Sequence, residues 1–267
     1  MKKNIIVKKE KALVNGIYKL TLDEQRLFHY TVAKVNPFKD KFGVIYKIPI
    51  KDIISFYNLS AGDAYTHFYG ALDKLFNRQI TFWDESLDLW NTCRFVINKY
   101  TDELGVIGLR FSHEMQNMVT SDKDFLSYKL EKTIGITSPN ANRIYEVLLY
   151  SLQRCPVQRL AKIIPCEELK ELMGLSEKYP RFADFKKYVL EVSKVQINKE
   201  TDIRLDYEII KTGRSPTHIK FIAQFKKGQE PNSVEIQEEL IIEPGKEKFD
   251  RVRSKEKLSE LKSKLKF

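Results

Sequence analysis

The sequence predicts an α+β protein built from two related halves, each a helix-turn-helix unit followed by a β-hairpin. The first observation behind this prediction is an internal repeat, because residues 48–60 match residues 164–176 at an offset of 116. One extra residue in the second copy then moves the offset to 117, which aligns Phe68 with Phe185. The other two observations are helical apolar spacing in both copies and β-rich runs after each of them. A repeat at a fixed offset indicates duplication of one structural unit.

The first two helices of each half follow from their terminal residues. Helices are expected over 21–35 and 138–152, because each segment begins at a Thr or Ser that can cap the free backbone amides. A short strand and a short helix come next in both copies of the repeat. Each short helix is opened by a proline, which fits the first helical turn, and is closed by Asn58 or Gly174. Asn and Gly are the residues that most readily adopt the left-handed conformation at a helix end.

The third helix of each half carries an apolar stripe that we expect to face the core. The stripe consists of Tyr65, Phe68, Leu72, Leu75 and Phe76 in the first half and of Phe182, Phe185, Val189 and Val192 in the second. The β-rich runs lie at 80–83, 93–99 and 105–111, and at 203–210 and 218–225. Residues 211–217, which join the last two runs, are basic and contain Gly and Pro, as expected of a wing. The sequence therefore predicts two tandem winged-helix domains, at 1–125 and 126–228, followed by a flexible charged tail at 229–267.

The charge of the chain indicates a polyanionic partner. The net charge is +10, and residues 137–228 supply +6 of it from 17 basic and 11 acidic side chains. Residues 229–267 carry nine of each sign and are neutral, so the excess lies in the folded body. Clustered Lys and Arg bind phosphates with release of counterions. Because a helix-turn-helix unit places its last helix in the major groove, two such units on a basic chain predict binding to double-stranded DNA.

Features of other protein classes are missing from the sequence. It contains no phosphate loop of the GxxxxGK type, and its four histidines all lie more than thirty residues apart. The three cysteines are odd in number and have no CxxC spacing, so we expect no metal, no cofactor and no enzymatic activity. No run approaches the ~20 apolar residues of a membrane span, so we expect a cytoplasmic protein without a membrane contact.

Helical projection selects the residues that we expect to contact DNA. In the second domain, Arg181, Asp184, Lys186 and Lys187 lie in the first turns of the recognition helix, which reach base edges. The full set of expected DNA-binding residues is Arg143, Arg181, Asp184, Lys186, Lys187, Lys194, Lys211, Arg214, Thr217, His218, Lys220, Thr66, His67, Lys74 and Arg78. The outward face of the first recognition helix is small and polar, which fits a DNA groove and a modest protein interface equally well.

The sequence resembles the initiator replication proteins of iteron-containing theta plasmids. The resemblance rests on residues 18–27, 142–148, 181–190, 197–203 and 217–221, which occur in the family's order. It implies monomers that bind repeated iterons at the origin and homodimers that bind an inverted repeat to repress their own gene. It also implies contacts with the host replication initiator and helicase. For a change between the two forms, the short polar connection at 120–124 is the expected place of domain reorientation.

Two other functions fit a protein of this predicted fold. A winged-helix transcriptional repressor without initiator activity has the same fold and charge, and only the resemblance favours initiation over it. A protein-interaction module is disfavoured by the charged face of the second recognition helix. The DNA around the coding region separates the first two, because tandem direct repeats indicate initiation and a lone inverted repeat indicates repression.

Overall fold

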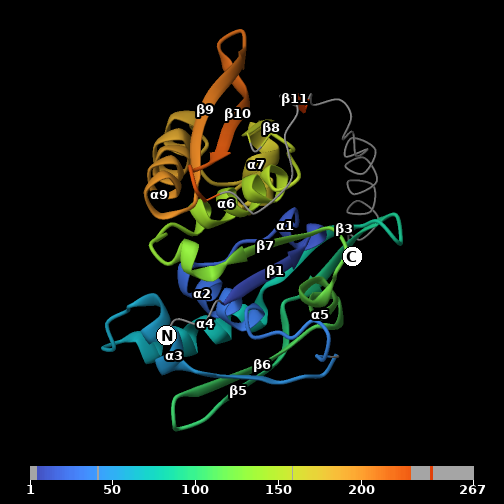
Figure 1. Ribbon diagram of the computed structural model, residues 1–267, viewed down its shortest axis with the longest axis vertical. Coiled ribbons are helices and arrows are strands. Elements are labelled where there is room, and N and C mark those ends of the chain that lie inside the picture. The colour runs from blue at the N-terminus through green and yellow to red at the C-terminus, as the bar shows by residue number, and fades with distance from the viewer. Residues whose placement is uncertain (1–4, 41, 158, 230–240, 243–267) are drawn as a thin grey trace.

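The chain folds into two winged-helix domains stacked along the long axis of the molecule (Figure 1). The computed structural model describes residues 5–40, 42–157, 159–229 and 241–242. The elements of the first domain are β1 (Ile6–Glu10), α1 (Lys11–Val14), α2 (Leu22–Val32), β2 (Tyr46–Pro49), α3 (Ile50–Tyr57), α4 (Ala64–Asn77), β3 (Gln79–Asp84), β4 (Leu89–Arg94), β5 (Val96–Thr101), β6 (Val106–Phe111) and α5 (His113–Thr120). The order β2-β6-β5 forms an antiparallel sheet, against which α2, α3 and α4 complete the winged-helix unit.

The elements of the second domain follow a similar order, with a single hairpin, β9–β10, after the last helix. They are β7 (Phe125–Lys129), η1 (Leu130–Thr133), α6 (Pro139–Leu152), β8 (Arg159–Pro165), α7 (Cys166–Leu172), α8 (Phe182–Phe185), η2 (Lys186–Glu191), α9 (Val192–Glu200), β9 (Ile203–Thr212), β10 (Ser215–Phe225) and β11 (Ile241–Ile242). The sheet order is β11-β8-β10-β9. Segments α8, η2 and α9 form one continuous helix with a π-helical middle, and β9 and β10 form the wing.

The predicted helix ends are confirmed with two differences, the first of which is that α2 ends at Val32 rather than at residue 35. Helix α2 begins at Thr21 with a capping box to Glu24, and α6 begins after Ser138, whose hydroxyl accepts from the Ala141 amide. Asn58 and Gly174 have φ values of 52° and 62°, so both occupy the left-handed region as predicted. The prolines that precede α3 and α7 are the N-cap residues of these helices rather than members of the first turn.

The first domain contains one hairpin more than the sequence predicted. The expected run at 93–99 is two strands, because β4 pairs with β3 in a separate two-stranded sheet and β5 pairs with β6. The chain crosses between the sheets at Phe95, whose fully buried ring packs edge-on against Tyr18 and Phe28. The first wing is therefore β5–β6. Its tip at 102–105 contains two acidic residues and lacks the basic character of the second wing.

The junction between the domains is a packed interface. Strand β1 pairs antiparallel with β7, so the start of the chain joins the segment that follows the first domain. Helix α6 lies between the two domains, and every residue from Ala141 to Leu152 is buried. Connection 120–124, expected to permit reorientation, is held at Asp124, whose carboxylate accepts from Arg154 and Tyr150. The main-chain oxygen of Asp124 accepts from the Lys11 amide. Residues of both domains therefore restrain this connection.

Most of the predicted tail at 229–267 lies outside the described residues. Of the tail residues that are described, Ile241–Ile242 form β11, which pairs in parallel with β8 at the edge of the second sheet. None of the described helices is both long enough and apolar enough to cross a membrane.

Candidate DNA interface

The recognition helix of the second domain presents its first turns to solvent. Arg181 is the N-cap residue of α8, and its side chain is exposed together with those of Lys186 and Lys187. Asp184 is half-buried in the first turn. The inward side is held by Phe185 and by two residues of η2, Val189 and Leu190, all fully buried, so the helix rests on the core while its charged side stays free. The orientation predicted for these residues is confirmed.

An aromatic pair that the sequence reasoning missed lies beside these charges. Tyr188 is 51% exposed on the recognition helix and stacks on Tyr179 at 6.4 Å, with 26° between the ring planes. Tyr179 has a φ of 57°, which is a strained conformation for a residue with a large side chain. The Lys187 ammonium lies 5.0 Å from the Tyr188 ring centroid. The spacing of four residues from Asp184 was the available signal, because it places Tyr188 on the same helical face.

The wing of the second domain is a long hairpin with a basic tip. Lys211 and Arg214 are exposed at that tip, and Gly213 supplies the positive φ of the turn. Thr217 and His218 are half-buried and bonded to each other, with His218 Nδ1 3.0 Å from the Thr217 hydroxyl.

Two other lysines expected to contact DNA are engaged by carboxylates. Lys220 donates to Glu208 at 3.1 Å and Lys194 donates to Asp206 at 2.6 Å. The hydrogen bond to Asp206 raises the pKa of Lys194. Both ion pairs are solvent-accessible and therefore weak enough to be exchanged for a phosphate.

The first domain offers fewer free cations. Thr66, His67 and Lys74 are exposed on α4, as predicted. Arg78 is held by a forked ion pair, in which Nε donates to Glu24 Oε1 at 2.8 Å and Nη2 donates to Oε2 at 3.2 Å. Burial disfavours the Glu24 carboxylate, but the Arg78 and Thr21 hydrogen bonds outweigh this and lower its pKa. Arg78 therefore joins the end of α4 to the start of α2. Tyr65, predicted to be core, is 37% exposed.

Arg143 does not belong to the DNA surface, contrary to the sequence prediction. It is 3% exposed, because its helix α6 is enclosed between the domains. Its guanidinium donates to the Tyr18 hydroxyl at 2.5 Å and to the Gly16 carbonyl oxygen at 2.9 Å. It also lies 3.9 Å from the Tyr18 ring centroid. Arg143 therefore fixes the segment that leads from α1 to α2.

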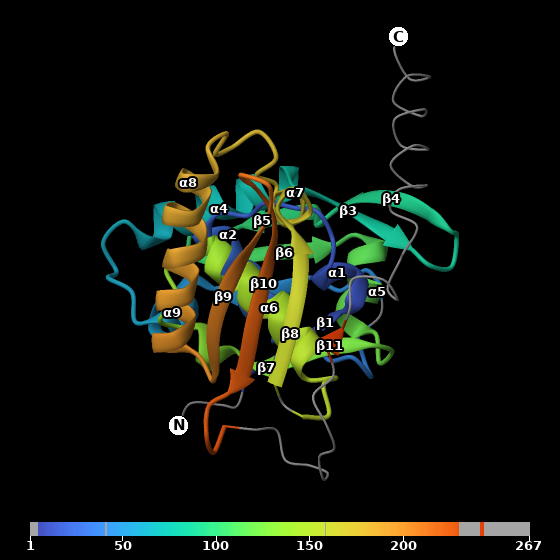
Figure 2. The ribbon, with the colours of Figure 1, turned by 90° about the horizontal axis from the view of Figure 1, so that it is seen from above.

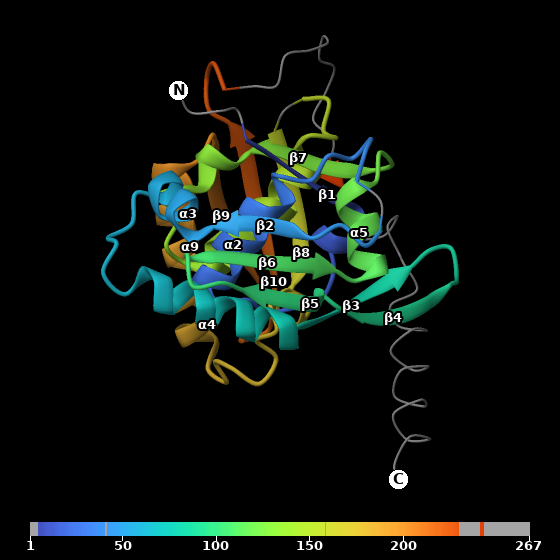
Figure 3. The ribbon, with the colours of Figure 1, turned by 90° about the horizontal axis from the view of Figure 1, so that it is seen from below.

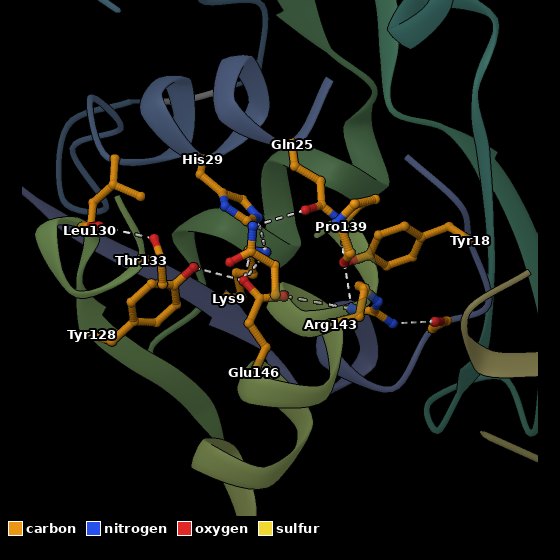
Figure 4. Close-up of polar contacts among 12 residues, drawn as sticks. Lys9, Tyr18, Gln25, His29, Tyr128, Leu130, Thr133, Pro139, Arg143 and Glu146 are labelled. Carbon is orange, nitrogen blue, oxygen red and sulfur yellow. Dashed lines mark hydrogen bonds and ion pairs between the residues drawn. The ribbon is translucent and has the colours of Figure 1, made fainter. Parts of the chain in front are cut away.

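Figure 4 shows that Arg143 is part of a buried polar network across the domain interface. Lys9 donates to Glu146 at 2.5 Å, and Lys9 Nζ lies 2.8 Å from His29 Nε2. The Tyr128 hydroxyl donates to the same Glu146 oxygen at 2.7 Å. Burial disfavours the Glu146 carboxylate, but the Lys9 and Arg143 charges and the Lys9 hydrogen bond outweigh it and lower its pKa to about 2. Burial and the neighbouring Lys9 charge lower the pKa of His29 to about 3, so this imidazole is neutral and accepts from Lys9.

Helix α4 and the start of the second recognition helix lie on one side of the molecule. Figures 2 and 3 view the stack from its two ends, and in both views α4 and the loop that precedes α8 are on the same side. Strand β7 lies on the opposite side in both views. A duplex that runs along the long axis of the molecule can therefore meet both helices at once.

Comparison with known proteins identifies this arrangement. The family model described as "Initiator Replication protein, WH1" matches residues 6–149, and the model described as "Initiator Rep protein, WH2" matches residues 165–223. The chain belongs to the initiator replication protein family. As a member of this family it is a DNA-binding replication initiator with two winged-helix domains.

Two solved structures match this chain. The Pi initiator protein, crystallised in complex with iteron DNA, matches with a TM-score of 0.71 and 18% sequence identity. The match covers 85% of this initiator and 100% of that chain. The WH1 domain of MSBI1.176, a replication protein isolated from a multiple sclerosis patient, matches with a TM-score of 0.33 and 22% identity, over 38% of this initiator and 81% of that domain.

Proposed function

We propose that this protein initiates plasmid replication by binding tandem iterons at the origin as a monomer, with both domains on one duplex. The observation that carries the proposal is the placement of α4 and the α8 region on one side of the molecule. The complex of the Pi initiator protein with iteron DNA supports it, because that protein shares the fold. The proposed domains are 1–125 and 126–228, and the reaction needs no catalytic residue, metal or cofactor of the protein.

The second domain supplies most of the sequence specificity in this proposal. Arg181 is placed to bind a guanine in a bidentate manner, and Asp184 to accept from a cytosine amino group. The exposed Tyr188 ring offers an apolar contact for a thymine methyl group. Lys186 and Lys187 hold phosphates or base edges beside them. The wing residues Lys211 and Arg214 approach the backbone or the minor groove.

Repression and host contacts complete the proposed function. The family resemblance supports a homodimer that binds an inverted repeat and represses the initiator's own gene, because a two-fold symmetric dimer matches two-fold symmetric DNA. It also supports recruitment of the host replication initiator and helicase. In the dimer the first domain exchanges its DNA contact for a contact with its partner.

Footprinting and sedimentation on two DNA fragments test the proposal. One fragment carries tandem direct repeats of about two helical turns each, and the other carries a single inverted repeat. We expect one protein per direct repeat and two per inverted repeat. The same stoichiometry per site on both fragments excludes the exchange between forms.

A plasmid assay then separates initiation from repression. An origin fragment that lacks its own initiator gene is maintained in cells only if the protein, supplied in trans, starts replication. Loss of the plasmid together with continued repression of the promoter identifies a transcriptional repressor. The exposed Lys129 on β7, on the side opposite α4, provides the control substitution Lys129→Ala, which we expect to leave both readouts unchanged.

A further inference from the structure

The two domains contribute one lysine each to a single place on the DNA-facing side. Lys19 lies between α1 and α2, and Lys178 lies in the loop between α7 and α8. The turn that leads into this loop is pressed against Lys19, because a Cβ atom built on Gly174 comes within 2.8 Å of the Lys19 Cβ. The Lys178 ammonium lies close enough to Lys19 for its charge to lower the pKa of Lys19.

These two amino groups have no acidic partner in the part of the chain that the structure describes. The ion pairs found there join neither Lys19 nor Lys178 to a carboxylate. The nearby Glu24 is occupied by Arg78, whose charge acts on Lys19 as well. Partial desolvation, the Lys178 amine and the Arg78 charge together lower the pKa of Lys19. Like charges this close repel each other, and an anion between them removes that cost.

The backbone at Lys19 is held in place by the buried residues next to it. The adjacent Tyr18 is buried, and its hydroxyl and ring are both held by Arg143. Lys19 itself is exposed. The amino group is therefore presented to solvent from a rigid segment, which lowers the entropy cost of binding an anion.

We propose that Lys19 and Lys178 together bind one backbone phosphate of the DNA duplex at the seam between the two domains. This inference rests on the proposed function, since the duplex must pass over both domains to reach the seam. The two lysines recognise the phosphate by its charge alone, so this contact adds affinity for DNA without reading a base. Because each domain supplies one of the two lysines, binding of this phosphate also favours the domain arrangement seen here.

Salt-dependent binding of four proteins tests the proposal. They are the wild type, Lys19→Ala, Lys178→Ala and the double variant, with Lys129→Ala as the matched control for loss of a surface charge. We expect each lysine substitution to weaken binding to DNA, and the factor of weakening to be the same on repeat-containing DNA as on scrambled DNA. The slope of log affinity against log salt should become shallower by about one in the double variant. The combined loss should be smaller than the product of the single losses, because both lysines hold the same phosphate.

Neutral phosphates locate the site on the DNA. Replacing one phosphate at a time by methylphosphonate should reveal a single position at which the wild type loses affinity and the double variant loses none. Losses that multiply, or affinities equal to that of Lys129→Ala, overturn the proposal. The proposed function fails separately if the wild type does not prefer repeats over scrambled DNA. The two results can be told apart because the effect of the two lysines is measured on both DNA fragments.

Discussion

Glu146→Gln should destabilise the protein far more than an ordinary surface substitution. The change keeps the volume of the side chain and removes only its charge. Lys9, which is fully buried, then loses its counter-ion and retains the neutral His29 and an uncharged amide as partners. The Arg143 guanidinium, 3.7 Å from Glu146 in the native protein, loses the same partner. A buried charge without a partner is lost by deprotonation or destabilises the fold.

The magnitude follows from the cost of deprotonating Lys9. An unfolded lysine has a pKa of about 10.4, so removing its proton at pH 7.5 costs about 4 kcal/mol at 1.36 kcal/mol per unit. Removing one partner of a buried ion pair costs about 3–5 kcal/mol. We therefore expect a loss of about 3–4 kcal/mol in the free energy of unfolding. The loss should shrink as the pH rises toward 10, because deprotonation then costs less.

Urea unfolding followed by far-ultraviolet circular dichroism measures this loss. The control is Glu85→Gln, because Glu85 is 62% exposed and pairs with Lys11 at the surface. We expect it to cost less than about 0.5 kcal/mol. The double variant Lys9→Met with Glu146→Gln should recover more than half of the loss, since no buried ammonium remains. An unfolding midpoint for Glu146→Gln equal to that of the control would refute the reasoning.

Four further expectations concern DNA binding, acid stability and the domain contact. Arg181→Ala and Lys187→Ala should each weaken binding to the specific repeat by about 1–3 kcal/mol if a base contact is lost, and unchanged footprints for both would exclude the assignment. Affinity should fall steeply with salt, and EDTA should not alter it; a flat salt plot contradicts the electrostatic basis. Stability should fall as the pH is lowered from about 6.5, because His29 takes up a proton in the unfolded state, whereas its pKa of about 3 keeps it neutral in the folded state. Glu146, whose folded pKa is about 2, adds to the loss of stability below about pH 4.5. In acid titrations, His29→Gln should remove the part of the loss that occurs above pH 4.5. Gly174→Ala should cost at least about 1 kcal/mol in thermal unfolding, because its φ of 62° is strained for alanine and the added Cβ meets Lys19.

The internal repeat predicted the helices and strands of both domains, because the matching positions are those that determine backbone structure. The matching apolar positions and the caps at Thr21 and Ser138 are local signals, and local sequence fixes helix ends. The inserted β3–β4 hairpin was missed because Phe95, a single buried residue, divides a continuous β-rich run between two sheets. Strand propensity does not show which partner a strand selects.

The exposed side of a helix could be predicted only where that helix packs on its own domain alone. The stripe that contains Phe185 and Val189 defines the free side of the recognition helix without knowledge of the other half. Arg143 was misplaced because α6 is covered on a second side by the other domain, and spacing along one helix carries no information about that contact. Lys9 had no signal at all, since a lysine beside charged neighbours resembles a solvated residue until Glu146 comes into contact with it.

The contact between Lys9 and Glu146 also sets an order of events during synthesis. The two residues are 137 positions apart, and ribosomes add about 5–20 residues per second. Lys9 is therefore made about 7 to 27 s before its counter-ion. During that interval the nascent first domain must leave this ammonium hydrated, and β1 must wait for β7, its only strand partner among the described residues. The start of the chain thus takes its final place only after translation has passed β7 and reached α6, so a ribosome stalled earlier carries a first domain without the β1–β7 pairing and the Lys9–Glu146 ion pair.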